Sequence, residues 1–267
     1  MPEGDTVYLA AQRLHGALAD RVLTTSDFRV PHLATTELTG RRVFEVVSRG
    51  KHLLTRVEGD LTLHTHLRMD GSWRLFRAGT RWSGGPAHEV RVVLGNDEWQ
   101  AVGYRLPVIE LIRTADEHTV VGHLGPDLLG PDWDADEALR RLKERPDREI
   151  GPALLDQRNL AGIGNLYKSE TLYLSGVNPW THVGDIADLG GVVRRAHRLI
   201  IANKDHAHQS TTGSTLRGQE NWVFERAGKP CRRCGTQIRR ATQPESGHEA
   251  EARITYWCPY CQPTSRP

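Results

Sequence analysis

The cysteines restrict most narrowly what this chain can fold into, because all four lie near its C-terminus in two Cys-x-x-Cys pairs separated by 23 residues. Two such pairs are typical of one closed tetrahedral zinc site, since four thiolates leave no position for a catalytic water. Two disulfides or four free thiols are the alternatives, and a reducing compartment disfavours the disulfides. The sequence therefore predicts one structural zinc ion with four ligands, Cys231, Cys234, Cys258 and Cys261.

The segment between the cysteine pairs predicts a β-hairpin held by this metal. Residues 239–242 and 253–257 flank a turn-rich stretch at 243–249, so Arg253 is expected to point outward from the second strand. Six lysines and arginines also occur between residues 226 and 240 without an acid among them. Such a basic block indicates contact with nucleic acid, although it is also typical of a solvated surface.

The first six residues predict a catalytic pair. Loss of Met1 would leave the secondary amine of Pro2 at the chain terminus, with the carboxylate of Glu3 beside it. Apolar residues from position 7 onward recur at helical spacing, so Asp5 or Thr6 is expected to cap a helix whose positive end lies near the Pro2 nitrogen. Positive potential favours the neutral, nucleophilic form of an amine. An ordinary frayed terminus is the alternative.

Length and composition set the outer bounds. With 267 residues, of which 38% are hydrophobic and 25% charged, the chain can bury a proper core and is expected to form two domains. No apolar run approaches the ~18 residues that a membrane helix requires, and no basic segment precedes the first helix as in a signal peptide. We therefore expect a cytoplasmic protein with no membrane partner. The net charge of +2 by itself says little about other partners.

Residues 1 to about 130 predict a mostly β domain that is entered by a helix. Short runs rich in Val, Leu and Thr are broken by turn residues, and the turns at 58–60 and 95–97 favour hairpins. Many short strands at this spacing indicate a two-sheet sandwich or a barrel. The expected strands are residues 22–27, 41–48, 52–57, 61–65, 72–76, 90–94, 99–102 and 108–113.

The second half of the chain predicts helices, after a linker at residues 130–132. A Gly-rich turn at 159–164 precedes one of them, where backbone N–H groups can hold a phosphate; an ordinary helix connector is the alternative. The predicted fold is α+β with two domains: an N-terminal helix plus a two-sheet β-sandwich, then a helical domain with a zinc-held β-hairpin. The expected division is 1–129, 130–225 and 226–267, and the expected helices are 134–145, 152–157, 165–174 and 187–203.

Four segments in this order resemble the formamidopyrimidine-DNA glycosylase and endonuclease VIII family of base-excision repair enzymes. They are the opening residues 1–4, the lysine segment 48–54, residues 155–167, which resemble the family's helix-two-turn-helix, and residues 228–261, which are similar to its zinc finger. The resemblance covers essentially the whole chain. It implies a bifunctional DNA glycosylase and abasic-site lyase that acts as a monomer on damaged double-stranded DNA, with single-stranded and bubble DNA left open as substrates.

The resemblance also implies a role for each matching residue. Pro2 would attack C1′ of the damaged nucleotide and form a Schiff base, after which β,δ-elimination cleaves the backbone. Glu3 would act as the general acid at the sugar. Lys51, Asn165 and Arg253 would hold the backbone phosphates. An exposed strand lysine, a helix cap and a surface charge are the respective alternatives.

A flipped base leaves a gap in the DNA stack, and residues 66–71 lie where the family carries the wedge that fills it. Met69 is the expected wedge, with Arg68 beside it; a core methionine is the alternative. The stretch from Thr215–Arg217 to Phe224 is too short for the loop that covers oxidised purines in one branch of the family, and residues 102–107 do not match that branch's Arg-Arg-Phe wedge. Both observations favour the endonuclease VIII branch and oxidised pyrimidines, with a purine-specific glycosylase as the alternative.

Two other classes of protein remain open at this stage. A non-enzymatic zinc-finger protein that binds DNA would not need Pro2. A metalloenzyme could use His64 and His66, or His206 and His208, because alternate strand positions share a face.

Overall fold

The computed structural model describes residues 2–245 and 248–264 and separates into two compact units, Met1–His123 and Leu124–Pro267. The first unit is a helix with two β-sheets, and the second combines helices with a two-stranded hairpin, which confirms the α+β prediction. The helical segments and the hairpin lie in one unit, so the division at 129 and 225 remains a prediction from the sequence. Among the described residues, no helix is long and apolar enough to cross a membrane.

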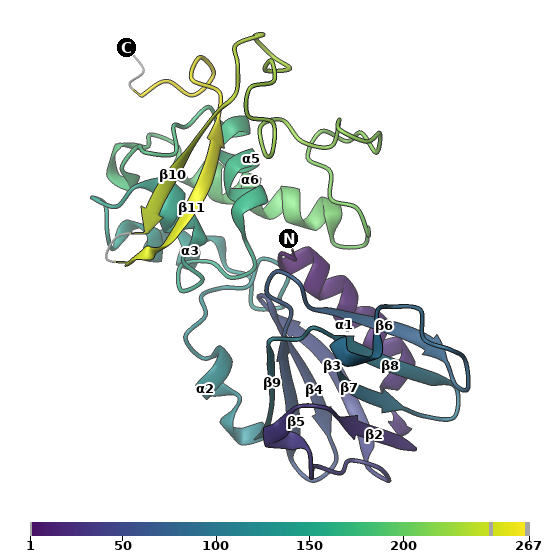
Figure 1. Cartoon of the computed structure of the whole chain (residues 1–267). Coiled ribbons are helices and arrows are strands. Elements are labelled where there is room, and N and C mark those ends of the chain that lie inside the picture. Colours follow the sequence, from purple (N-terminus) through teal and green to yellow (C-terminus); the bar gives the residue numbers. More distant parts are fainter. Residues whose placement is uncertain (1, 246–247, 265–267) are drawn as a thin grey trace. The chain divides into compact units, whose positions relative to one another are not determined.

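The first unit contains two antiparallel sheets (Figure 1). One has the strand order β1-β3-β4-β5-β9 and the other β2-β7-β8-β6. All eight predicted runs form strands, and only the first is divided. The strands are β1 Arg21–Val22, β2 Thr25–Phe28, β3 Arg42–Arg49, β4 His52–Val57, β5 Leu61–His66, β6 Ser72–Arg77, β7 Val90–Gly95, β8 Trp99–Tyr104 and β9 Val108–Arg113.

The division of the first predicted strand has a local cause. The backbone N–H of Leu23 donates to Arg41 in the first sheet, whereas that of Thr24 donates to Gly95 in the second. The chain therefore passes from one sheet to the other between these two residues, and β1 and β2 pair with different partners.

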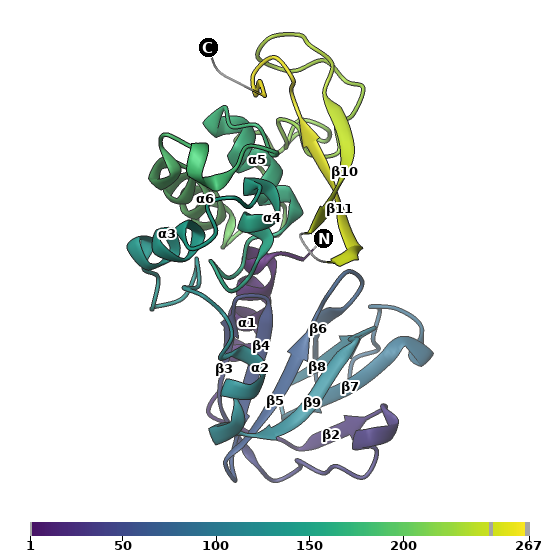
Figure 2. The ribbon, with the colours of Figure 1, turned by 90° about the vertical axis from the view of Figure 1, so that its left-hand side faces the viewer.

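Helix α1 (Gly4–Leu18) packs against strands of both sheets, β3 and β4 of one and β6 and β8 of the other (Figure 2). Its buried face carries Val7, Ala11, Leu14 and Leu18, which join the side chains between the sheets in one apolar core. A short helix, α2 (His118–Val121), was not predicted; its four residues bury no side chain, so no amphipathic pattern marks it in the sequence.

The second unit is built around helix α5 (Asn165–Ser175), of which nine consecutive residues are buried. Gly176 ends α5 in the left-handed conformation with φ 65°, and the side chain of Asp134 caps α3. The four predicted helices and the hairpin are present. The elements are α3 Ala135–Lys143, α4 Ile150–Leu155, α5, α6 Leu189–Asn203, β10 Arg239–Glu245 and β11 His248–Trp257.

A buried polar chain fixes the hairpin to the helices of this unit. The Lys168 ammonium group on α5 donates to Thr255 Oγ1 at 2.7 Å, and the Thr255 hydroxyl donates to the side-chain oxygen Oε1 of Gln243 at 3.0 Å. The amide nitrogen of Gln243 then donates to Glu149 Oε2 at 2.7 Å. Lys168, Thr255 and Gln243 are each at most 3% exposed. Because losing one partner would leave buried polar groups unsatisfied, this chain holds the strands in one register on α5.

Candidate active site and metal centre

The N-terminal pair lies at the start of α1. The helix begins at Gly4, and Glu3 is its N-cap residue with extended backbone, φ −112° and ψ −174°. The prediction that Asp5 or Thr6 caps the helix is therefore wrong, since both lie inside its first turn. Glu3 and Asp5 are both almost fully buried, at 0% and 1% exposure. The positive end of the helix thus begins directly after Pro2, closer to its nitrogen than expected.

Strand register shows which turns share an end of the sandwich with Pro2. His52 on β4 pairs with His66 on β5, and His66 pairs with Val108 on β9. The turns that adjoin these residues, 50–51, 67–71 and 105–107, therefore lie at one end. The turn between β7 and β8 lies at the other end, where Asn96 donates its side-chain amide to the carbonyl of Ala17 at 2.9 Å. The C-terminus of α1 is thus fixed at the opposite end.

Helix α1 runs antiparallel to β3. The backbone N–H of Asp20 donates to Val43, while that of Val46 donates to His15 Nδ1, so earlier helix residues lie beside later strand residues. Fifteen helical residues span about 22 Å, and the strand from Val43 to Arg49 spans about 20 Å. Pro2 and Glu3 therefore reach the level of the turn that contains Lys51. The structure brings Pro2, Glu3 and Lys51 to the same end of one unit.

Lys51 lies in the tight turn between β3 and β4. Gly50 has φ 57° in this turn, a left-handed conformation that glycine adopts without steric cost. Lys51 itself is half-buried. Lys51 therefore lies in a two-residue turn and not within a strand, so the alternative of an exposed strand lysine does not apply.

A histidine cluster that the sequence analysis missed lies behind Lys51. His52 Nδ1 is 2.9 Å from His64 Nε2, and His64 Nδ1 is 3.0 Å from the carboxylate of Glu110. The ring of His66 meets that of His52 edge to face at 4.8 Å. Both ring nitrogens of His64 are thus occupied by hydrogen bonds, so His64 and His66 do not form the metal-binding pair considered above. The sequence offered only the alternation of His64 and His66, since the placement of His52 and Glu110 beside them depends on strand register.

Burial and positive neighbours keep His52 and His66 neutral at pH 7. Burial lowers the pKa of His52 to about 3, aided by His66, His64, His123 and Lys51. Burial likewise lowers the pKa of His66 to about 4, aided by Lys51, Arg68 and His64. Since His52 and His66 are uncharged at neutral pH, the positive charge beside them comes from Lys51 and Arg68.

The cluster predicts a loss of stability in mild acid. Because these pKa values in the folded state lie below the unfolded value near 6.5, stability is complete above about pH 6.5 and falls as the pH decreases towards 4 and then 3. At pH 5 the free energy of unfolding should be lower than at pH 7 by about 2 kcal/mol for each histidine. Urea denaturation at both pH values measures this, and His52→Gln should reduce the difference. The exposed His208→Gln control should retain it, and equal differences in all three proteins would contradict the assignment.

The predicted wedge forms an exposed tip at the same end of this unit. Met69 is 54% exposed, so the alternative of a core methionine is wrong. Arg68 is exposed and has φ 46°, which is uncommon for a residue with a side chain. Gly71 ends the turn where a Cβ would lie 2.6 Å from the carbonyl oxygen of Leu67, so only glycine fits.

Arg105 supports this tip and was not predicted. It has φ 48°, donates from Nε to the Asp70 carbonyl at 3.2 Å and forms an ion pair with Glu89 at 2.8 Å. Arg68 and Arg105, in two turns that contact each other, thus both have left-handed backbone, a strained arrangement of the kind that concentrates at functional sites. No local pattern in the sequence marks it, because the strain depends on the packing of two separate turns.

In the second unit, the structure brings the segments of Asn165 and Arg253 together. Asn165 is the first residue of α5, is 7% exposed and donates its side-chain amide to the carbonyl of Ile254 at 2.8 Å. Arg253 directly precedes Ile254 on β11 and is exposed, as predicted. The turn before α5 is also fixed, because Gln157 donates to the carbonyl of Ile163 and accepts from the N–H of Gly162.

The four cysteines form a cluster that could hold a metal ion. Their sulfur atoms all lie within 4.8 Å of one another, and three of the separations are 3.5, 3.6 and 3.9 Å. Zn–S bonds of about 2.3 Å in a tetrahedron place the sulfur atoms about 3.8 Å apart, so the observed spacing fits that ion. Within the described residues, no other set of His, Cys, Asp and Glu side chains converges in this way. His206 and His208 are both exposed.

The basic block around the first cysteine pair serves two purposes. Arg226 is buried and donates to the carbonyls of Trp222 and Pro230, and Arg232 donates to those of Asn221 and Gly218. These two arginines hold the loop before the hairpin. Lys229, Arg239 and Arg240 are exposed and remain available for a polyanion, so only part of the block fits the nucleic-acid interpretation.

Comparison with solved structures defines the class of fold. The chain is similar to Lactococcus lactis Fpg in a complex with abasic-site DNA, with a TM-score of 0.80 and 24% identity over 97% of this chain and 99% of that one. This similarity shows that the two chains share a two-domain fold.

Sequence comparisons define the family. The model of the formamidopyrimidine-DNA glycosylase N-terminal domain matches residues 1–105, and that of its H2TH domain matches residues 124–190. Probable endonuclease 8 2 of Streptomyces coelicolor is 60% identical over 100% of this chain and 96% of its own length. DNA-(apurinic or apyrimidinic site) lyase Nei2 of Mycolicibacterium smegmatis is 43% identical over 99% and 100%. The chain therefore belongs to the formamidopyrimidine-DNA glycosylase and endonuclease VIII family, the glycosylases and abasic-site lyases of base-excision repair.

Proposed function

We propose that this enzyme removes oxidised pyrimidines from DNA through a Schiff base on Pro2 and then cleaves the backbone by β,δ-elimination. The observation that carries the proposal is the position of Pro2 and the buried Glu3 at the start of α1, level with the turn of Lys51. The reaction requires that Met1 has been removed, so that the Pro2 nitrogen is a free amine.

The chemistry follows from these positions. The Pro2 nitrogen attacks C1′, the bond from C1′ to the base breaks and the base leaves with a proton. Glu3, shielded from water, protonates the sugar-ring oxygen, so that the ring opens to an iminium ion. Loss of a proton from C2′ then expels the 3′ phosphate, and a second elimination expels the 5′ phosphate. Acid–base assistance of this kind contributes about 10²- to 10⁴-fold to the rate.

Lys51 is proposed to bind a phosphate beside the lesion, and Asn165 and Arg253 to bind the same backbone from the second unit. The Asn165–Ile254 hydrogen bond and the buried contact of Lys168 with Thr255 support a fixed placement of the latter two. Arg68 and Met69 are proposed to fill the gap left by the flipped base, because their turn is exposed. The four cysteines are proposed to hold one structural zinc ion.

The preference for pyrimidines is supported by the segment after α6. Glu170 is fully buried and accepts hydrogen bonds from the backbone N–H groups of Trp222, Val223 and Phe224, each at 2.8 Å. Only four residues, 218–221, lie between Arg217 and Trp222, the first residue bound to Glu170, which leaves no room for a long loop over a purine. Damaged duplex DNA as partner, a monomeric state and action in the cytoplasm at the nucleoid belong to the same proposal.

A lesion panel tests the proposal. Duplexes that carry thymine glycol, dihydrouracil, 8-oxoguanine, an abasic site or no lesion are incubated with the enzyme and borohydride, which reduces a Schiff base to a stable covalent complex. We expect trapping and strand cleavage on the first two and on the abasic site. Efficient trapping on 8-oxoguanine alone would instead support the purine-specific alternative, and no trapping on any duplex would favour a non-enzymatic DNA-binding protein.

Replacement of Lys51 by alanine should weaken binding to every DNA sequence. One lost phosphate contact reduces the slope of log Kd against log salt concentration by about one. Fluorescence anisotropy with an abasic-analogue duplex measures the slope, and the exposed Lys143→Ala is the matched control with the same change in charge. An unchanged slope in the Lys51 variant would count against a phosphate contact.

A further inference from the structure

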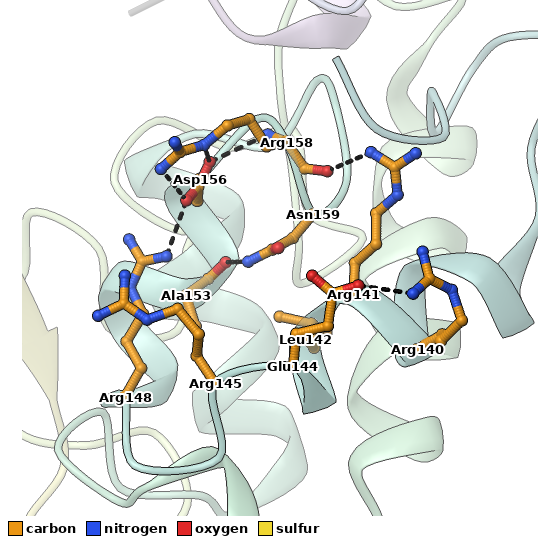
Figure 3. A pocket seen from close by; sticks show the side chains of 10 residues that line it. All are labelled: Arg140, Arg141, Leu142, Glu144, Arg145, Arg148, Ala153, Asp156, Arg158 and Asn159. Carbon is orange, nitrogen blue, oxygen red and sulfur yellow. Dashed lines mark hydrogen bonds and ion pairs between the residues drawn. The ribbon is translucent and has the colours of Figure 1, made fainter. Parts of the chain in front are cut away.

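Five arginines line a hollow on the second unit that none of the roles above uses (Figure 3). It is open to one side and has a volume of about 310 Å³. Its walls come from α3, from the segment that leads to α4 and from the turn that follows α4. We call it the arginine pocket; its charged lining is Arg140, Arg141, Arg145, Arg148, Arg158 and Asp156, with Glu144 at the wall.

The inner part of the pocket is rigid. Asp156 accepts from Arg148 at 2.8 Å and from two nitrogens of Arg158 at 2.9 and 2.8 Å. Burial raises the pKa of Asp156, but these bonds outweigh that effect and hold the pKa well below its usual value. Arg141 donates to Glu137 and also to the carbonyl of Arg158 at 2.8 Å, as Figure 3 shows for the latter contact. The guanidinium groups of Arg141, Arg148 and Arg158 are therefore held in place before any ligand arrives, which lowers the cost of binding.

The charges of the pocket do not balance. The residues that line the pocket include five arginines but only two acids, Asp156 and Glu144. Glu137 lies outside the lining and binds Arg140 and Arg141. No residue in the described part of the chain pairs with Arg145, which is exposed. An ordinary network of surface ion pairs would be close to neutral and would project from the surface. A concave site whose lining carries more guanidinium groups than carboxylates instead suits an anion.

We propose that the arginine pocket binds a phosphate group. Guanidinium groups present paired donors that match phosphate oxygens, and they do so best where their orientation is fixed. The phosphate can belong to DNA outside the lesion or to a free phosphate compound. The first of these sources rests on the proposed function. Both sources offer the same chemistry, and two measurements distinguish them.

The variant for both measurements is Arg140→Gln with Arg145→Gln, which removes two exposed guanidinium groups and leaves the Asp156 contacts intact. Arg194→Gln with Arg198→Gln is the matched control, because both side chains are exposed, lie on α6 and change the net charge equally. Glu144→Gln, which removes a carboxylate that is 57% exposed, should act in the opposite direction and tighten binding.

The first measurement is the salt dependence of binding to undamaged duplex DNA. A DNA phosphate in the pocket predicts that the slope of log Kd against log salt falls by about one in the double variant and not in the control. The second is the melting temperature with inorganic phosphate or pyrophosphate and no DNA. A free phosphate ligand predicts a rise in the parent protein that the double variant lacks.

A change in either measurement supports the proposal and identifies the source. Parent-like behaviour of the double variant in both measurements would overturn the proposal, provided that circular dichroism shows the variant to be folded. If the double variant does not fold, Glu144→Gln decides: tighter binding supports the proposal, and unchanged binding overturns it. Neither measurement involves base removal, so failure here is distinguishable from failure of the proposed glycosylase activity.

Discussion

Replacement of Pro2 by glycine is expected to abolish the borohydride-trapped complex and to reduce base removal by more than the ~10²- to 10⁴-fold expected for loss of general acid–base assistance. Proline supplies a secondary amine whose ring fixes its direction at the start of α1. After attack it loses its single N–H proton, so the iminium that forms has no N–H left to lose and stays cationic. Glycine leaves a primary amine on a freely rotating terminus. The measurement is single-turnover cleavage and trapping on a thymine glycol duplex.

Two further variants make this test specific. Glu3→Gln should retain the amine and lower the rate by about 10²- to 10⁴-fold, or roughly 3 to 5 kcal/mol of activation free energy. Acetylation of the terminus, which removes the nucleophilic lone pair, should reproduce the Pro2→Gly result. The Pro2 variant should keep the melting temperature and DNA affinity of the parent, because Pro2 is only half-buried. Normal rates in the Pro2 variant would mean that another group is the nucleophile.

Replacement of Cys258 by serine is expected to release the metal and unfold the hairpin. Binding of structural zinc contributes on the order of 10 kcal/mol to folding, more than the total stability of many domains. Cys258 is also fully buried among Tyr173, Val223 and Ile238, so the cysteine cluster is part of a small apolar core. Because Arg253 is on β11, DNA affinity should fall together with metal content.

The measurements are the zinc content of the purified protein and its affinity for an abasic-analogue duplex. The parent should contain one zinc ion per chain. Tyr260→Phe is the control within the same cysteine pair, since Tyr260 is 73% exposed, and it should retain both properties. A Cys258→Ser protein with full zinc content and parent-like affinity is the result that rules out the four-cysteine site.

The sequence predicted the secondary structure well where local patterns are strong. Every predicted strand and helix is present, because alternation and helical spacing are properties of a few neighbouring residues. The start of α1 was misplaced because Asp5 and Thr6 are frequent capping residues, whereas here Glu3 occupies the cap position without a side-chain cap bond. The crossing from β1 to β2 could not be predicted, because it depends on which distant strand accepts each N–H group.

The candidate site shows the same division. Pro2, Glu3 and the four cysteines could be selected from the sequence, because each depends on a short motif with specific chemistry. The Glu110–His64–His52 chain could not, since it joins three strands through cross-strand register. Lys168 and Thr255 are 87 positions apart and contact only because the hairpin packs on α5.

By itself, the sequence determined the elements and singled out the four cysteines and the Pro2–Glu3 pair as candidates, since local spacing and side-chain chemistry are written directly into it. Only the tertiary structure decided that Lys51 lies level with Glu3, that His52 and His66 are neutral and that five arginines line one hollow. These properties depend on burial and on distances between residues remote in the chain, and such quantities exist only once the core has packed.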